Sequence, residues 1–271
     1  MDNRPVGVFD SGIGGLTAVR EIFRILPGED IIYFGDTGRV PYGSRSRETI
    51  LKYTRQDIRF LRTFDIKAIV VACGTVSTAA LDVISGEYDI PLIGVARASA
   101  VRAAGETKNR RVGLIGTEAS IRSGAYERML AQYCPEAEVR SAACPLFVPL
   151  VENGRIERGD VVIETVAREY LGALAAWKPD VLILGCTHYP LLKGIIEDVF
   201  GDGVLLIDSG AEAAENLKSV LTMTEKLAKA DRQGSASFFV SDSAESFERS
   251  AAMFLGGEFQ GRAEKIDIET F

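Results

Sequence analysis

Short apolar runs alternate with longer amphipathic segments along most of the chain. The runs are continuous stretches of Val, Ile and Leu more often than alternating patterns, which is typical of parallel strands covered by helices on both faces. We expect strands at Val6–Phe9, Ile31–Phe34, Ala68–Ala72, Leu92–Val95, Val112–Ile115, Val181–Leu184, Leu205–Ile207 and Ser237–Val240.

The segments between these runs carry apolar residues at helical spacing. We expect helices at Leu16–Leu26, Arg47–Phe64, Ile121–Gln132, Asp160–Leu174 and, near the end of the chain, Ser246–Leu255. Strands that alternate with helices in this way form βαβ units with a parallel sheet. The pattern therefore predicts an α/β fold.

The two halves of the sequence resemble each other. Val6–Ser11 is similar to Val112–Thr117, and Cys73 and Cys186 follow at nearly the same offset. The chain has 271 residues, and domains average about 150 residues. We therefore expect two pseudo-symmetric parallel-sheet domains, formed by residues 1–97 with 208–271 and by residues 98–207. In open parallel sheets ligands bind outside the carboxyl ends of the strands, so the active site should lie in the cleft between the domains.

Charge and targeting signals narrow the class of protein. The chain has 31 basic and 38 acidic residues and a net charge of −7, which gives no general attraction to nucleic acid or to an anionic membrane. Met1–Pro5 lacks the apolar core of a signal peptide, and no run approaches the roughly 20 apolar residues of a membrane span. We expect a cytoplasmic protein without a nucleic-acid or membrane partner.

The cysteine pattern does not indicate a disulfide framework or a metal site. The four cysteines include no Cys-x-x-Cys pair, and His188 is the only histidine. Without a signal peptide such thiols are expected to be reduced, and structural zinc sites usually draw on closely spaced Cys and His. Cys134 and Cys144 do not follow expected strands, so we interpret them as packing residues or loop thiols.

Cys73 and Cys186 each end an apolar run and begin a polar turn, within Ile69–Thr75 and Leu182–His188. An enzyme that inverts a carbon centre needs one acid/base group on each face of that carbon, and two facing thiols supply them. A single cysteine is more often a buried packing residue. Two cysteines at matching strand ends favour a catalytic pair.

His188 lies two residues after Cys186. A free thiol has a pKa of about 8.5, so a neighbouring imidazole would promote its ionisation. The alternative is a histidine that caps a helix or is hydrogen-bonded in the core.

Asp10–Gly15 follows an expected strand and precedes an expected helix. It is not a dinucleotide-binding loop, because Thr17 stands where the third glycine is needed, and no Lys-Ser/Thr follows as in a P-loop. A helix N-terminus still suits a carboxylate ligand. Asp10 and Ser11 are therefore candidates for the site, with a simple N-cap as the alternative for Asp10.

Gly35–Ser44 is a long turn after another expected strand. Its Pro41-Tyr42-Gly43 segment could present backbone N–H groups and a phenol to a small anion, although Pro and Gly are also common in ordinary turns.

Glu152 is either a surface charge or an acid that supports the site.

Several of these segments together carry a family resemblance. The chain resembles the cofactor-independent aspartate/glutamate racemase superfamily, and within it the glutamate racemases, over nearly its full length. The matching blocks are Phe9–Gly15, Tyr33–Asp36, Pro41–Gly43, Val71–Cys73 with Thr75, Ile115–Thr117, Val148–Glu152, Leu184–Pro190 and Ile207–Gly210.

The resemblance implies an enzyme that interconverts L- and D-glutamate by proton transfer at the α-carbon, without a cofactor or metal, and supplies D-glutamate for peptidoglycan. Cys73 would face the α-hydrogen of the D-isomer and Cys186 that of the L-isomer, while Asp10, Glu152 and His188 would tune or relay protons. The resemblance also implies a possible homodimer. Substrate would be held by Asp10, Ser11, Pro41, Tyr42, Gly43, Gly74, Thr75, Thr117, Thr187 and His188.

Two positions depart from the family pattern. Gly74 stands where the family usually has asparagine, and Ser120 where threonine is common. Loss of one hydrogen bond to a charged group costs about 1.5–3 kcal/mol unless water or another residue replaces it. Three alternatives to a glutamate racemase stay open. They are an aspartate racemase or related small-diacid isomerase, a Cys-His hydrolase that needs only one thiol, and an amino-acid-binding protein without catalysis.

Overall fold

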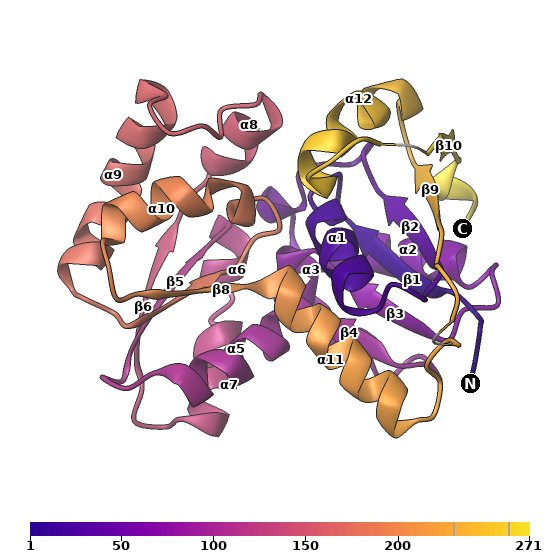
Figure 1. Cartoon of the computed structure of the whole chain (residues 1–271), viewed down its shortest axis with the longest axis horizontal. Coiled ribbons are helices and arrows are strands. Elements are labelled where there is room, and N and C mark those ends of the chain that lie inside the picture. Colours follow the sequence, from indigo (N-terminus) through magenta and orange to yellow (C-terminus); the bar gives the residue numbers. More distant parts are fainter. Residues whose placement is uncertain (230, 260) are drawn as a thin grey trace.

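The computed structural model describes residues 1–229, 231–259 and 261–271 and contains two parallel sheets side by side (Figure 1). Sheet A has the strand order β10-β9-β2-β1-β3-β4 and sheet B the order β6-β5-β7-β8. The strands are β1 (Val6–Asp10), β2 (Ile31–Gly35), β3 (Ala68–Val71), β4 (Leu92–Gly94), β5 (Arg111–Gly116), β6 (Glu138–Ala143), β7 (Val181–Leu184), β8 (Leu205–Asp208), β9 (Ala236–Val240) and β10 (Ala263–Lys265). The predicted α/β fold with two parallel-sheet domains is confirmed.

The two sheets share one strand order. The sequence β2-β1-β3-β4 in sheet A recurs as β6-β5-β7-β8 in sheet B, so β1 corresponds to β5 and β3 to β7. Every strand pair in both sheets is parallel. The internal similarity seen in the sequence is therefore a repeated topology, and equivalent strands end at equivalent edges.

Helices cover both faces of each sheet, and apolar side chains fill the layers between them. On sheet A, α1, α11 and α12 cover one face and α2, α3 and α4 the other; on sheet B, α8, α9 and α10 face α5 and α7 across the strands. The helices are α1 (Leu16–Ile25), α2 (Arg47–Leu61), α3 (Gly74–Ala79), α4 (Leu81–Ile84), α5 (Val95–Glu106), α6 (Glu118–Arg122), α7 (Ala125–Tyr133), α8 (Phe147–Glu152), α9 (Val161–Ala176), α10 (Lys193–Phe200), α11 (Ser209–Met223) and α12 (Ala244–Leu255), with short 3-10 turns η1 (Tyr42–Ser44), η2 (Tyr189–Leu192) and η3 (Ile268–Thr270).

Side-chain caps fix where several helices begin. Ser46 caps α2, Asp160 caps α9 and Asp208 caps α11, each accepting hydrogen bonds from backbone N–H groups of the first turn. Such caps satisfy donors that have no partner within the helix and typically contribute about 1 kcal/mol. Asp208 ends β8 and starts α11 without an intervening loop, so α11 runs directly from sheet B back toward sheet A (Figure 1).

Every expected strand is present, but two strands and one helix break were not foreseen. β6 is largely exposed at the edge of sheet B and polar in sequence, so it lacks the apolar run on which the prediction depended. β10 is a short edge strand of sheet A. The helix expected at Ile121–Gln132 is wrong: Gly124, with φ of +61°, separates α6 from α7, because glycine adopts the left-handed region at little cost.

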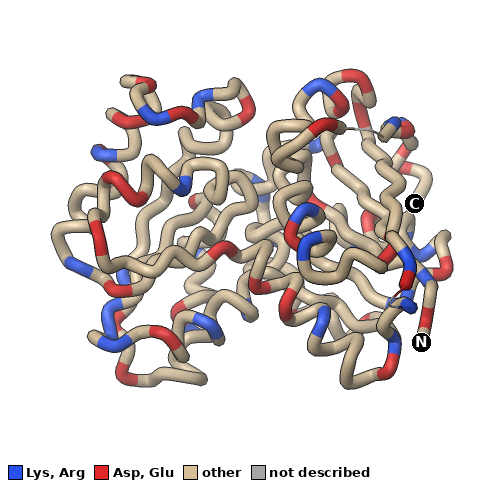
Figure 2. Tube along the Cα trace, viewed as in Figure 1, with Lys and Arg blue, Asp and Glu red and all other residues tan. Residues whose placement is uncertain are grey.

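Basic and acidic residues are interspersed along both halves of the molecule (Figure 2). This arrangement agrees with the modest net charge. None of the helices in the described parts of the chain is long and apolar enough to cross a membrane.

Candidate active site

A cavity of about 420 Å³ lies where the carboxyl ends of the central strands of both sheets meet. The whole predicted set of site residues lines it, from the turns of both sheets. These residues are Asp10, Ser11, Pro41, Tyr42, Gly43, Cys73, Gly74, Thr75, Thr117, Glu152, Cys186, Thr187 and His188. The convergence of strand-end turns expected from the sequence is therefore present in the structure.

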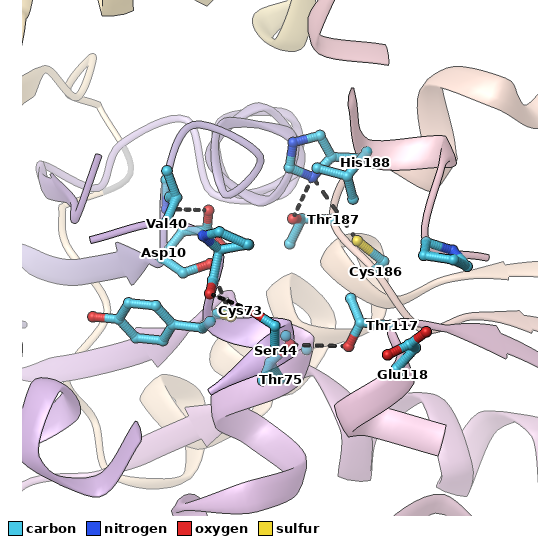
Figure 3. Close-up of a pocket in the computed structure, with 18 of the residues that line it drawn as sticks. Asp10, Val40, Ser44, Cys73, Thr75, Thr117, Glu118, Cys186, Thr187 and His188 are labelled. Carbon is cyan, nitrogen blue, oxygen red and sulfur yellow. Dashed lines mark hydrogen bonds between the residues drawn. The ribbon is translucent and has the colours of Figure 1, made fainter. Parts of the chain in front are cut away.

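The repeated topology positions the two thiols. Cys73 follows β3 and directly precedes α3, while Cys186 follows the equivalent strand β7. Asp10 ends β1, and Thr117 follows the equivalent strand β5, where it caps α6. Figure 3 shows Asp10 and Cys73 on one side of the cavity and Cys186, Thr187 and His188 on the other.

Cys73 lies among neutral donors and a buried carboxyl group. Its Sγ donates to Ser11 Oγ at 3.3 Å. Burial, together with the nearby Asp10 carboxyl, raises the pKa of the Cys73 thiol to about 12, because both disfavour a second negative charge. At neutral pH Cys73 therefore carries its proton.

Asp10 is buried beside Cys73, with 2% of its surface exposed. Its Oδ2 accepts from the backbone N–H of Gly12 at 2.9 Å, but burial outweighs this bond and the attraction of His188, and raises the pKa of the carboxyl. Asp10 is not the N-cap of α1, because that position belongs to Gly15. Its side chain instead braces the turn that lines the cavity.

Cys186 faces an imidazole that is paired with a carboxylate. Its Sγ lies 3.9 Å from His188 Nδ1, and His188 Nε2 lies 2.9 Å from Glu152 Oε1. Burial alone would lower the pKa of His188, but hydrogen bonds with Cys186 and Glu152 outweigh burial and raise that pKa to about 10. The imidazole is therefore protonated at neutral pH, and Glu152, whose side chain is 44% exposed, links it to solvent.

The imidazole is also held by packing. The ring of Phe254, from α12, stands edge-on to His188, with a centroid separation of 5.2 Å and an interplanar angle of 85°. Edge-to-face contacts of this kind contribute about 0.5–1.5 kcal/mol beyond burial. His188 is thus fixed by the neighbouring Cys186 and by Glu152 and Phe254 from two distant parts of the chain.

Hydroxyl groups supply most of the remaining polar lining. Thr75 Oγ1 and Thr117 Oγ1 are 3.1 Å apart, so the two sheets are joined across the cavity. Thr187 Oγ1 lies 3.4 Å from His188 Nδ1. No Lys or Arg is among the described residues that line the cavity, so an acidic ligand would be bound by hydroxyls, backbone N–H groups and His188.

Tyr42 does not present its phenol to the cavity, so that part of the prediction is wrong. Its hydroxyl donates to Asp36 Oδ2 and lies 3.2 Å from Asp57 Oδ2, and the side chain is 1% exposed. Arg39 bonds both of these carboxylates, at 2.7 and 3.1 Å. The Tyr42 hydroxyl therefore anchors the turn through Asp36 and Asp57. Other atoms of the turn line the cavity.

The sequence did not single out several lining residues. Cys144 and Pro145 follow the unforeseen strand β6, and Val148 and Pro149 belong to α8. Cys144 is a wholly buried thiol whose pKa burial raises to about 12. Cys144 does follow a strand, because β6 ends at Ala143 and corresponds to β2, and its buried side chain agrees with the interpretation as a packing residue. Had β6 been predicted, Cys144 would have been recognised as a residue at a strand end.

The chain matches the family model described as Asp/Glu/hydantoin racemase over residues 13–217. The chain belongs to this racemase family. Among its curated relatives is a glutamate racemase of Geobacter metallireducens, 46% identical, with alignment over 99% of this chain and 98% of the relative.

Solved structures agree with this membership. A glutamate racemase isoform from Bacillus anthracis is 38% identical with a TM-score of 0.93, and the match covers 98% of each chain. A glutamate racemase from Francisella tularensis, solved in complex with D-glutamate, is 40% identical with a TM-score of 0.90 and covers 100% of each chain. The two-sheet architecture around the cavity is therefore that of the racemase family.

Proposed function

We propose that the protein interconverts L- and D-glutamate by two-thiol proton transfer at the α-carbon. The observation that carries this proposal is that Cys73 and Cys186 end equivalent strands and line one cavity from opposite sheets. The glutamate racemases among its relatives support the choice of substrate.

In the proposed reaction with L-glutamate, the Cys186 thiolate removes the α-proton and the Cys73 thiol delivers its own proton to the opposite face. The S–H bond of Cys186 forms as the Cα–H bond breaks, and a new Cα–H bond forms as the S–H bond of Cys73 breaks. The protonated His188 stabilises negative charge on the Cys186 sulfur, and Cys73, with its raised pKa, begins as the acid. The D-isomer reacts by the reverse sequence.

The carbanionic transition state must be stabilised by groups already in place. Ser11, Thr75, Thr117 and Thr187 bring hydroxyls to the cavity, and the adjoining turns bring backbone N–H groups. We assign the two substrate carboxylates to these donors, together with the turn at Pro41–Gly43. Donors fixed by a rigid fold need no reorganisation during the reaction, which makes them effective in a cavity shielded from water.

Three further proposals concern the whole protein. Sheet membership supports domain boundaries at residues 1–97 with 208–271 and at residues 98–207. We also propose that the protein acts in the cytoplasm, where its product would supply D-glutamate for peptidoglycan. The homodimer implied by the family resemblance is retained as a proposal, to be tested by sedimentation.

Incubation of each glutamate enantiomer with the protein in heavy water tests the reaction. We expect deuterium at the α-carbon together with inversion for both enantiomers, and absence of exchange from both would refute the proposal. Aspartate in the same assay separates the small-diacid alternative, since faster turnover of aspartate would favour it. Replacement of either cysteine by serine tests the hydrolase alternative, which requires only one thiol.

A further inference from the structure

The residues that adjoin the two thiols touch backbone to backbone. Gly74 directly follows Cys73, Gly185 directly precedes Cys186, and both line the cavity. A β-carbon added to Gly74 would overlap the carbonyl oxygen of Gly185, and it would lie 3.3 Å from the carbonyl carbon and 3.8 Å from Cys186 Cα. The structure thus leaves no space for even a methyl group between the two strand ends.

Neither partner in this contact can retreat within its own sheet. The backbone N–H of Gly185 donates to Ile115 O at 2.8 Å, and a β-carbon on Gly185 would lie 2.7 Å from the same oxygen. On the other side, the carbonyl of Cys73 accepts from Ser77 N at 2.9 Å in the first turn of α3. Because the overlapped atom is backbone, no rotamer change relieves the contact. The two sheets themselves would have to move apart.

Other contacts hold the sheets in register around this point. Thr17 Oγ1 donates to Thr187 O at 3.0 Å, and the Thr75 and Thr117 hydroxyls form a second link between the two sheets. Gly14 packs so closely on Thr187 and His188 that a β-carbon there would overlap both side chains. A shift at Gly74 would therefore strain hydrogen bonds that join the two sides of the cavity.

We propose that Gly74 is a positioning residue that sets the separation of the two thiols. The proposal rests on the two-thiol mechanism above. A side chain at this position would move the strand ends apart by about 1 Å to reach ordinary contact, and displacements of this size cost up to about 100-fold in rate when two groups must act on one atom. Backbone of the other sheet thus occupies the space beside position 74, where the family resemblance leads us to expect asparagine.

The test compares Gly74→Ala with Gly172→Ala. Both glycines are helical, but a β-carbon on Gly172 meets nothing within 4 Å, so this variant controls for the higher helix propensity of alanine. We expect kcat for glutamate racemisation to fall about 10- to 100-fold in Gly74→Ala. The melting temperature of Gly74→Ala should also fall, because the hydrogen bonds between the sheets are strained, whereas Gly172→Ala should keep at least the melting temperature of the parent. The primary isotope effect with α-deuterated glutamate should rise, because proton transfer becomes more strongly rate-limiting.

Gly74→Asn separates close approach from a missing amide. The proposal predicts the same loss of kcat as for Gly74→Ala, since both add a β-carbon. If Gly74→Asn lowers KM and keeps kcat, position 74 is only a lost substrate donor and the proposal is overturned.

Crystal structures of the parent and Gly74→Ala provide a readout that does not depend on activity. We expect a longer distance between the Sγ atoms of Cys73 and Cys186 in the variant, and an unchanged distance would overturn the proposal. A parent protein that fails to racemise glutamate would refute the proposed function instead, while the crystal structures would still decide whether Gly74 sets the spacing.

Discussion

The two sides of the cavity have the same backbone plan but opposite electrostatics. Cys73 and Cys186 follow equivalent strands, β3 and β7, in sheets of the same order. Cys73 lies beside a carboxyl group with a raised pKa, whereas Cys186 lies beside an imidazole whose pKa is raised to about 10. The repeated fold therefore supplies the symmetry of position, and different residues at the equivalent strand ends supply the difference in charge.

This difference suits a reaction that starts with one thiolate and one thiol. If both thiols had the surroundings of Cys73, both would hold their protons at neutral pH, and neither could remove the α-proton. A symmetric reaction thus benefits from an asymmetric resting site.

The largest expected effect comes from removing each thiol in turn. Cys73→Ser and Cys186→Ser should each lower kcat/KM for racemisation about 10⁴-fold. Enantiomers have equal free energy in solution, so each variant must lower kcat/KM equally in both directions. The two sides separate only in α-deuterium exchange without inversion, measured by proton NMR in heavy water.

We expect Cys73→Ser to retain exchange of L-glutamate and lose that of D-glutamate, with the reverse in Cys186→Ser. Equal loss of exchange from both enantiomers in each variant would contradict the assignment of one thiol to each face.

Replacing the polar partners should have a smaller effect of the same kind. His188→Gln removes the cation beside Cys186, and Asp10→Asn removes the carboxyl group that would relay protons to and from Cys73. We expect kcat/KM to fall about 100-fold in each, within the range of a positioned acid or base. Exchange assays should show the larger loss for L-glutamate in His188→Gln and for D-glutamate in Asp10→Asn. The same enantiomer preference in both variants would contradict the separate roles of the Cys73 and Cys186 sides of the cavity.

The sheet A side of the cavity also depends on the buried hydroxyl of Tyr42. Tyr42→Phe leaves Asp36 and Asp57 short of a donor, so the free energy of unfolding should fall by about 1–3 kcal/mol. Urea denaturation measures this change. Tyr126→Phe is a matched control, because the buried Tyr126 hydroxyl has no hydrogen-bond partner among the described residues. Equal stabilities of the two variants would argue against the anchoring role of Tyr42.

The smallest expected effect concerns the pH profile of the Cys186 side. His188 has a folded-state pKa of about 10, above its ordinary value of 6.5, so its stabilising contribution is complete below pH 6.5 and is lost as pH rises through about 10. Glu152→Gln removes one group that raises this pKa. We expect the alkaline limb of kcat/KM to move to lower pH, as measured between pH 6 and 10.5. An unmoved limb would show that Glu152 does not set the charge of His188.

The sequence predicted those parts of the fold that depend on local apolar pattern. The buried strands β1, β3, β5 and β7 are continuous apolar runs, and the turns that follow them identified the site. β6 is mostly exposed at a sheet edge, where burial imposes no such pattern, and the strand was missed together with Cys144. Cys144 shows how one missed strand removes a lining residue from the predicted site.

The orientation of the Tyr42 side chain and the charge of His188 could not be predicted from the sequence. The Tyr42 hydroxyl turns away from the cavity because Asp36 and Asp57, from separate elements, bind it. The pKa of His188 depends on Glu152, which is distant in sequence. Such contacts are set by tertiary packing, and the spacing of residues along the sequence does not indicate them.

The edge-on contact between His188 and Phe254 ties the site to α12, a helix that follows all of its acid/base groups in the sequence. During synthesis the ribosome produces both thiols, the histidine and Glu152 well before α12 emerges and folds. Until then one side of the imidazole lacks its apolar neighbour and is open to water, which weakens its interaction with the thiol. A nascent chain would thus hold all its acid/base groups and still be a poor catalyst until α12 has folded beside His188.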